Sequence, residues 1–206
     1  MPRELVFVVE DDDAARESLE ALLETAGYRT AAFASGAAFL DSLGSASGAC
    51  VVLDIKMPEM DGLEVQRRLN DSGALLPVIF VTGHGDVAMA VQAMHAGAID
   101  FIEKPIGRDR LLGSVARAID VSGNVRRHEE EKSGIVARMD RLTARERDVL
   151  RRLVAGQPNK VAARHLGISH RTVEIYRRNV MTKMGAQSLS HLVRMAIVAG
   201  FKPPDD

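Results

Sequence analysis

Apolar and polar positions along the first 120 residues predict short buried strands separated by amphipathic helices. Each apolar run is short and ends in polar residues, which is typical of parallel strands buried on both faces. The intervening segments carry an apolar stripe and stop at glycine, as at Gly27 and Gly97. Five such units predict an α/β fold with a five-stranded, doubly wound parallel sheet covered by helices on both faces. The predicted strands are Leu5–Val9, Thr30–Phe33, Val51–Leu53, Val78–Val81 and Asp100–Lys104.

From residue 142 onward the pattern predicts helices only. Thr143 and Glu146 form the sequence signature of a capping box at the start of the first helix. A tight glycine turn separates the second helix, Lys160–Leu166, from the third, His170–Met184. A fourth helix, Ser188–Ala199, closes a small all-α bundle that contains a helix-turn-helix.

The formal net charge of −1 is divided unevenly along the chain. Residues 1–120 contain 19 acidic and 10 basic residues, hence −9, whereas residues 121–206 contain 9 acidic and 17 basic residues, hence +8. Such asymmetry suggests an acidic module joined to one that meets a polyanion, although unequal solvated surfaces would give the same counts. The charged segment 122–141 is expected to be a solvated, partly helical linker. The predicted organisation is an α/β domain over residues 1–121, a linker over 122–141 and a helical domain over 142–202.

The single cysteine and the hydropathy of the chain indicate the cellular compartment in which the protein is expected. Cys50 is the single cysteine and lies in an apolar run, so it is expected to be an inert core residue. One chain with one cysteine forms no internal disulfide, which fits a reducing cytoplasm. The apolar run Leu5–Val9 is too short for a signal peptide or a membrane span. We therefore expect a cytoplasmic protein with no membrane partner.

The predicted strand ends carry polar residues that suit phosphoryl chemistry. These residues are expected at one edge of the sheet, where the carboxyl ends of parallel strands meet. Three carboxylates there can hold Mg²⁺ through oxygen, and the metal and a lysine would neutralise a phosphoryl group. Each acid taken alone is more often a turn former or a helix cap, so the prediction depends on the whole set. The set is Glu10, Asp11, Asp54, Thr82 and Lys104.

The same residues resemble the receiver domain of two-component response regulators over residues 4–120. The resemblance also includes the motifs Met57-Pro58, Asp61-Gly62, Thr82-Gly83 and Lys104-Pro105. It implies a CheY-like (flavodoxin-like) fold with Asp54 as phosphoacceptor and with Thr82 and Phe101 as switch residues. We expect a phosphoryl oxygen bonded to Thr82 to draw the loop over residues 82–86 inward, which leaves space into which the ring of Phe101 turns. Glu10 departs from the family pattern, in which aspartate is commoner, and its longer side chain would reach the metal through water. The resemblance implies Glu10, Asp11, Asp54 and the carbonyl of Lys56 as Mg²⁺ ligands, and Thr82 and Lys104 as phosphoryl-binding residues.

The third predicted helix of the second domain has two distinct faces. At 100° per residue, one stripe is apolar and the opposite face is mostly polar and basic but includes Ile175. A helix, a glycine turn and a second helix with an exposed basic face suit the DNA major groove, whereas a four-helix interaction module would show a similar pattern. The apolar stripe is Val173, Tyr176, Val180 and Met184, and the opposite face is Arg171, Glu174, Ile175, Arg178 and Thr182.

Residues 142–200 also resemble the LuxR/FixJ/NarL-type output domain. The resemblance rests on the Thr143–Glu146 box, on Asn159-Lys160 and on the string from Ser169 to Met184. It implies that Glu174, Ile175 and Arg178 face the DNA bases. The implied phosphate-contact candidates are Lys160, Arg171, Arg177 and Lys183.

The order of receiver and helix-turn-helix is most similar to FixJ-type regulators, and it implies a DNA-binding response regulator rather than an enzyme. The implied partners are a sensor histidine kinase, a double-stranded DNA operator, a second copy of the chain after phosphorylation, and RNA polymerase. Two alternatives stay open. An aspartate-nucleophile phosphotransferase would use the same Mg²⁺ site, although the haloacid-dehalogenase type would want an acid at Lys56. An adaptor would bind a partner helix with its helical half, and salt-dependent DNA binding would separate these classes.

Overall fold

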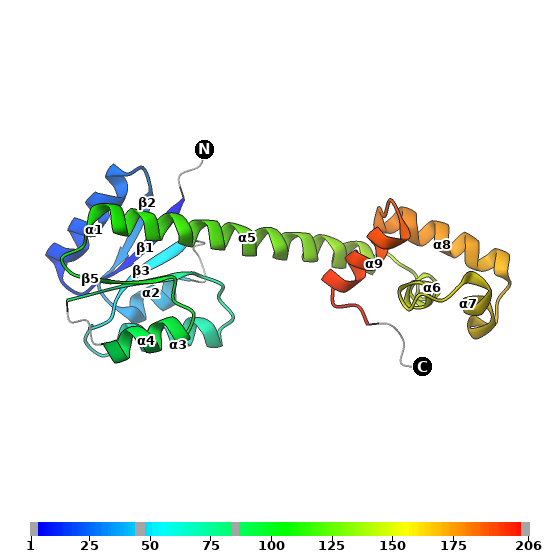
Figure 1. Ribbon diagram of the computed structural model, residues 1–206, viewed down its shortest axis with the longest axis horizontal. Helices are drawn as coiled ribbons and strands as arrows, with labels where there is room; N and C mark the ends of the chain where they lie inside the picture. The colour runs from blue at the N-terminus through cyan, green and yellow to red at the C-terminus, as the bar shows by residue number, and fades with distance from the viewer. Residues whose placement is uncertain (1–3, 44–47, 84–86, 203–206) are drawn as a thin grey trace. The chain divides into compact units, whose positions relative to one another are not determined.

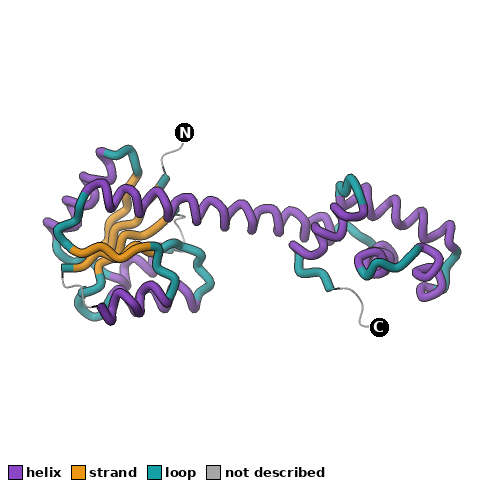
Figure 2. The backbone as a smooth tube through the Cα atoms, in the orientation of Figure 1, coloured by secondary structure: helices purple, strands orange, loops and turns teal. Residues whose placement is uncertain are grey.

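The computed structural model describes residues 4–43, 48–83 and 87–202. The chain divides into two compact units, Met1–Arg126 and Arg127–Asp206, and each is described by itself. The first unit contains the strands and the second contains only helices (Figure 2).

The first unit is built on a five-stranded sheet in the order β2-β1-β3-β4-β5, with every neighbouring pair parallel. The doubly wound parallel sheet predicted from the sequence is therefore confirmed. Strand β3 is central, and all of its residues are buried because it is covered on both faces. The strands are β1 (Leu5–Val9), β2 (Arg29–Phe33), β3 (Cys50–Asp54), β4 (Val78–Thr82) and β5 (Asp100–Glu103).

Two layers of helices cover the sheet (Figure 1). Alternate strand residues point to opposite faces, so that Phe7 and Val51 join one apolar cluster while Val6 and Val52 join the other. Helices α2 (Gly36–Ser42), α3 (Gly62–Asp71) and α4 (Val87–His95) supply the first cluster. Helix α1 (Asp13–Thr25) and the first turns of α5 (Arg108–Asp140) supply the second.

Side-chain caps fix where three of these helices begin. Asp12 caps α1 by accepting the N–H of Ala15 at 2.8 Å, and Asp61 caps α3 by accepting the N–H of Glu64 at 2.8 Å. Ser35 caps α2 in the same way. Two of the acids near the predicted site thus hold helix ends, which is the ordinary role expected of an isolated acid in such a loop.

The second unit is a bundle of short helices around one apolar cluster. The capping box is present, because Thr143 and Glu146 each accept from the backbone of the other. Gly167 ends α7 in the left-handed conformation, with φ of 66°. The helices are α6 (Ala144–Val154), α7 (Asn159–Leu166), α8 (His170–Met184) and α9 (Leu189–Val198).

Helix α5 differs from the segment expected between the two domains. Residues 122–141 were expected to be a solvated and only partly helical linker, whereas α5 continues unbroken to Asp140. Ile135 and Met139 are buried in the cluster of the second unit, so the end of α5 belongs to that core. Within the described residues, no helix is both long and apolar enough to cross a membrane.

Candidate functional site

The carboxyl ends of four strands bring the predicted receiver residues to one edge of the sheet. Asp54 is the last residue of β3, and Glu10 directly follows the neighbouring strand β1. On the other side, Thr82 ends β4 and accepts the backbone N–H of Lys104, which follows β5, at 2.8 Å. Asp54 at the end of the central strand β3 therefore lies between Glu10, after β1, and the ends of β4 and β5, which carry Thr82 and Lys104.

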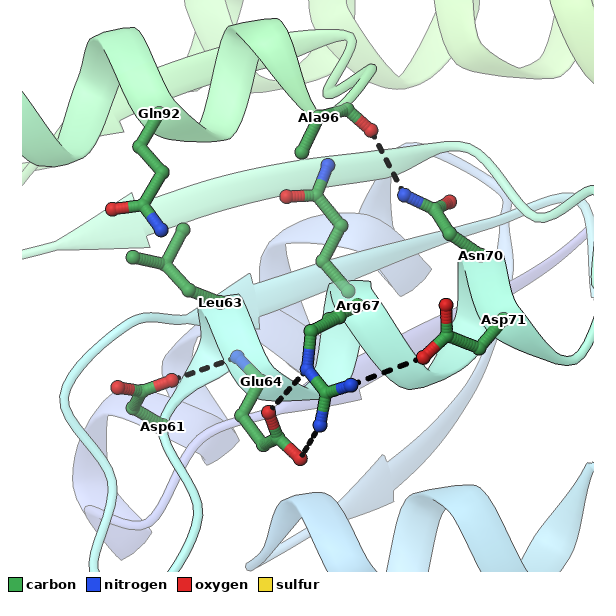
Figure 3. A pocket seen from close by; sticks show the side chains of 9 residues that line it. Asp61, Leu63, Glu64, Arg67, Asn70, Asp71, Gln92 and Ala96 are labelled. Atoms are coloured by element: carbon green, nitrogen blue, oxygen red, sulfur yellow. Dashed lines mark hydrogen bonds and ion pairs between the residues drawn. The ribbon is translucent and has the colours of Figure 1, made fainter.

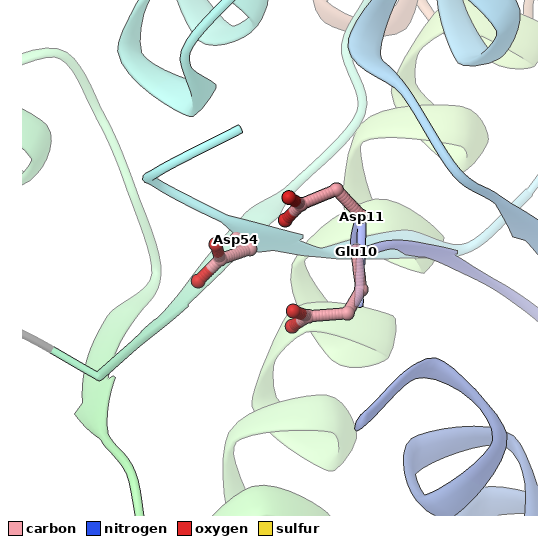
Figure 4. A group of neighbouring side chains, drawn as sticks. All are labelled: Glu10, Asp11 and Asp54. Atoms are coloured by element: carbon pink, nitrogen blue, oxygen red, sulfur yellow. The ribbon is translucent and has the colours of Figure 1, made fainter. Parts of the chain in front are cut away.

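Three carboxylates form a compact acidic cluster at this edge (Figure 4). One ligand oxygen each from Glu10, Asp11 and Asp54 lies within 4.8 Å of the others. Among the described residues, Oδ1 of Asp54 is buried and has no hydrogen-bond partner. A buried carboxylate oxygen without a hydrogen bond, beside two further carboxylates, suits a hard divalent cation such as Mg²⁺. Lys56 comes two residues after Asp54 and has an exposed side chain, and the role of its carbonyl as a ligand stays a prediction.

Lys104 lies against these acids as predicted from its strand end. Its Nζ is 2.7 Å from Oε2 of Glu10 and 3.5 Å from Oδ1 of Asp54. Glu10 is 1% exposed, and its buried carboxylate is paired with this lysine. The lysine therefore lies nearer to Glu10 than to Asp54, whose Oδ1 has no hydrogen bond within the described residues.

Burial changes the protonation behaviour of the group. Desolvation raises the pKa of both Glu10 and Asp54 above the usual values, and Lys104 partly opposes this. Burial alone would lower the pKa of Lys104, but the hydrogen bond to Glu10 and the charge of Asp54 raise it overall. A second cation at the cluster would lower the cost of keeping both acids ionised.

The two predicted switch residues lie at neighbouring strands. Thr82 is fully buried at the end of β4. Phe101 in β5 is half-buried and packs against the cluster that includes α4. A cavity of about 260 Å³ lies beside Phe101, lined also by Val87, Ala90, Val91, Glu103 and Arg110. The predicted loop movement over residues 82–86 includes residues 84–86, which lie outside the described residues.

Position 62 requires glycine for a steric reason that the sequence motif alone does not reveal. Its N–H donates to the carbonyl of Ile55 at 2.9 Å, and this bond holds the first residue of α3 against the end of β3. A Cβ at this position would overlap the carbonyl oxygen of Asp54 and lie 3.1 Å from Cα of Ile55. Only glycine therefore fits without moving the backbone that carries Asp54.

We expect Gly62→Ala to destabilise the protein by about 1–3 kcal/mol, as overpacking against backbone does. It should also slow phosphoryl uptake, because the strand end that holds Asp54 must shift. Urea unfolding and donor labelling measure the two effects. Gly113→Ala is the matched control, since a Cβ there meets only Arg117 at 3.9 Å. Equal stability of the Gly62→Ala protein and the wild type would refute the steric argument.

Two charged networks were not anticipated from the sequence. At β5, Asp100 accepts from Ser114 at 2.5 Å and from Arg117 at 2.7 Å, which ties the strand to α5. Hydrogen bonds from Ser114 and Phe101 N–H hold the pKa of Asp100 below its usual value despite partial burial. Arg110 donates to the carbonyl of Phe101 at 2.8 Å. The spacing of Ser114 and Arg117, three residues apart on one face of α5, is the sequence signal that could have indicated a bond to Asp100.

The second network lines a groove of about 570 Å³ between α3 and α4 (Figure 3). Arg67 bonds Glu64 and Asp71 in the same helix, at 2.7 and 3.1 Å. The hydrogen bond from Arg67 contributes most to lowering the pKa of Glu64 to about 2. Asn70 donates to the carbonyl of Ala96 at 3.0 Å. The pairs of Arg67 lie within α3, whereas the bond from Asn70 joins α3 to the residue that follows α4. We assign the groove no role in the chemistry at Asp54.

In the second unit, α8 has the two faces predicted from its periodicity. Val173, Val180 and Met184 are fully buried, and Tyr176 packs against the same cluster. Ile175 is 51% exposed although it is apolar. The other predicted base-facing and phosphate-contact residues on the outer side are also exposed, and these are Arg171, Glu174 and Arg178 in α8 and Lys160 in α7.

Two of the predicted phosphate contacts already have partners inside the protein. Lys183 Nζ lies 2.7 Å from Oε2 of Glu146 in an ion pair whose acid is buried. Arg177 donates to Oδ1 of Asn159 at 3.1 Å, and so braces α7 against α8. Both arrangements favour a structural contribution, while the predicted DNA contacts of these two residues stay untested.

Comparison with known proteins gives a family for each unit. The family described as "Response regulator receiver domain" matches residues 6–116, and "Bacterial regulatory proteins, luxR family" matches residues 140–196. The transcriptional regulatory protein FixJ of Azorhizobium caulinodans is 49% identical over 207 residues, covering 100% of this chain and 98% of that protein. FixJ of Bradyrhizobium diazoefficiens is 46% identical over 195 residues and is covered to 95%, as is this chain.

Solved structures agree with this result. The response regulator StyR aligns with a TM-score of 0.83 at 37% identity, over 95% of this chain and 98% of StyR. Full-length FixJ from B. japonicum aligns with a TM-score of 0.59 at 45% identity, over 97% of this chain and 98% of that one. The chain belongs to the FixJ-type response regulators, which join a receiver domain to a LuxR-type DNA-binding domain, as in phosphorylation-controlled transcription regulation.

Proposed function

We propose that this protein is a transcription regulator switched by phosphorylation of Asp54. The observation that carries the proposal is a buried Asp54 oxygen without a hydrogen-bond partner among the described residues, beside Glu10, Asp11 and Lys104. Phosphoryl transfer needs positioning and charge compensation more than covalent chemistry from the protein. The proposed domain limits are a receiver over residues 1–121, a DNA-binding domain over 142–202 and, between them, a helical linker over 122–141 whose last turns pack in the second core.

In the proposed transfer, a carboxylate oxygen of Asp54 attacks the phosphorus of a phosphohistidine on the kinase. The phosphorus–nitrogen bond breaks, and the leaving imidazole takes a proton from solvent. Lys104 would balance the charge of the phosphoryl oxygens, and Thr82 would donate a hydrogen bond to one of them. Bound by Glu10, Asp11, Asp54 and the Lys56 carbonyl, Mg²⁺ would supply further charge compensation.

The output step is proposed to be dimerisation through the face formed by α4, β5 and α5. Two apolar residues of α4 support this surface, since Val87 is 78% exposed and Val91 is 50% exposed. The cavity beside Phe101 gives the ring space to turn when Thr82 engages the phosphoryl group. A shift from mostly monomer to mostly dimer needs only a few kcal/mol of differential stability.

We expect beryllofluoride, a phosphoryl mimic, to convert micromolar protein from monomer to dimer in sedimentation velocity. Val91→Asp should remain monomeric with the mimic, because a charge would be buried in the interface. Leu75→Asp is the matched control, since Leu75 is 62% exposed outside this face. A monomer in both states that still binds DNA equally well would show that the switch works differently.

The DNA-binding step is proposed to use α8 in the major groove. Arg178, Glu174 and Ile175 would contact base edges, while Lys160, Arg171, Lys183 and Arg177 are the candidates for phosphate contact. We further propose a cytoplasmic regulator without enzymatic turnover, which acts on RNA polymerase at the operator.

Selection of operators from a random DNA pool tests the function as a whole. The full chain is incubated with and without a small phosphodonor in the presence of Mg²⁺. We expect strong enrichment of one sequence class only with the donor. Enrichment that is the same in both arms would separate DNA binding from phosphorylation, and no enrichment in either arm would contradict the DNA-binding role.

A further inference from the structure

The C-terminal end of the recognition helix α8 is bonded to the junction between α5 and α6. Arg138, in the last turn of α5, donates from Nη1 to the carbonyl oxygen of Met184 at 3.2 Å across 46 residues of sequence. Lys183 donates to the carbonyl oxygen of Arg141 at 3.4 Å and to Glu146 at 2.7 Å. Both links join α8 to residues that lie outside the helix-turn-helix itself.

The carbonyl groups at the end of α8 explain why an arginine is held there. The last carbonyls of a helix have no partner within the helix. Gly185 adopts φ of 67° and donates to the carbonyl of Thr182, and Ala186 donates to that of Met181. Met184 is fully buried, and its carbonyl takes its hydrogen bond from Arg138. The guanidinium also places positive charge at the negative end of the helix dipole.

Apolar packing reinforces this polar link. Ile135 and Met139 of α5 are buried in the same cluster as Val180 and Met184 of α8. Arg138 lies between these two apolar residues in sequence and bonds the backbone at the end of the α8 stripe. A change in the last turns of α5 would therefore act directly on the end of the helix that presents Arg178.

We propose that Arg138 is a positioning residue for DNA reading, through which the last turns of α5 fix the orientation of α8. The inference rests on the proposed DNA-binding function, because it assumes that α8 reads base edges. Arg138 touches no DNA base in this proposal. It acts by holding the Met184 carbonyl, so its loss would misalign the base-reading side chains while leaving the charge of α8 unchanged.

The test compares Arg138→Ala with Arg138→Lys and with Lys132→Ala in the full chain. Lys132 is exposed on the same helix, so Lys132→Ala removes an equal charge without the carbonyl bond. The readout is the ratio of affinities for the selected operator and for random DNA at one salt concentration, together with amide hydrogen exchange at the end of α8. A change in stability or in overall charge alone would not alter this ratio.

We expect Arg138→Ala to lower the operator-to-random ratio by about threefold, less than the loss from removing a direct base contact, because Arg138 acts on the base-reading side chains only indirectly. Lys132→Ala should leave the ratio unchanged, and Arg138→Lys should restore part of it because lysine keeps a cationic donor. An unchanged ratio in Arg138→Ala overturns the proposal.

If the wild type prefers no sequence, the proposed DNA-binding function itself fails. Amide hydrogen exchange then decides whether Arg138 positions α8. Faster exchange at the end of α8 in Arg138→Ala but not in Lys132→Ala supports the positioning role, and exchange equal to that of the wild type overturns it.

Discussion

Asp54→Asn protein is expected to take up no phosphoryl label from a small phosphodonor or a phosphorylated kinase, whereas the wild type is labelled only with Mg²⁺. The amide of asparagine is nearly the same size as the carboxylate but is not a nucleophile for phosphorus. Because Asp54 is 4% exposed, the replacement keeps the packing and removes the charge. The measurement is acid-stable retention of labelled phosphate on the intact chain, and the expected effect is complete loss.

Asp61→Asn is the matched control for this experiment. Asp61 lies in the loop after β3 and caps α3 through its side chain. Asparagine caps helices about as well as aspartate, so labelling should continue. Asp11→Ala should remove Mg²⁺ dependence together with uptake, because it deletes one of the three clustered carboxylates. Full labelling of the Asp54→Asn protein would place the phosphoacceptor elsewhere.

The sheet and the position of the acidic cluster at its edge were predictable because both depend on local signals. A run such as Val51–Leu53 is too short and too apolar for anything but a buried strand, and parallel strands must align their carboxyl ends. The convergence of Asp54 and Lys104 follows from that geometry. That Lys104 lies closer to Glu10 than to Asp54 does not follow, since the difference depends on the position of one ammonium group to within an ångström.

The continuity of α5 was harder to predict. Ser133 and Gly134 interrupt the charged segment, and glycine in a helix costs about 1 kcal/mol relative to alanine. The structure offsets this cost by burying Ile135 and Met139 in the second core. That contact depends on residues far along the chain, such as Val180, so the local sequence around Gly134 does not reveal it.

Lys183 shows the same limit within the DNA-binding domain. From sequence alone, a lysine near the end of a basic helix that pairs within the protein cannot be distinguished from one that contacts a DNA phosphate. The buried partner, Glu146, lies 37 residues earlier and was predicted only as part of a capping box. Its carboxylate serves both roles, accepting from Thr143 and from Lys183. The hydrogen bonds from Lys183 and Thr143 lower the pKa of Glu146 although burial opposes them.

Arg178→Ala is expected to relax the operator requirement at one base pair by about 1–3 kcal/mol, the value of one bidentate base contact. Arg178 is exposed on the face of α8 opposite Val180, one turn beyond Glu174 and beside the exposed Ile175. A guanidinium matches the O6 and N7 acceptors of guanine, which a methyl group cannot replace. Binding to every single-base variant of the selected operator measures the effect position by position.

Lys160→Ala is the contrasting variant, since Lys160 is exposed near the start of α7 rather than on α8. It should weaken binding to all sequences alike and reduce the salt slope by about one unit, because one phosphate contact is lost. Arg178→Lys separates charge from geometry, as lysine keeps the cation but not the planar fork. It should retain the salt dependence of the wild type while losing discrimination at the same base pair. Uniform losses across all operator variants for both Arg178→Ala and Lys160→Ala would contradict the assignment of Arg178 to a base.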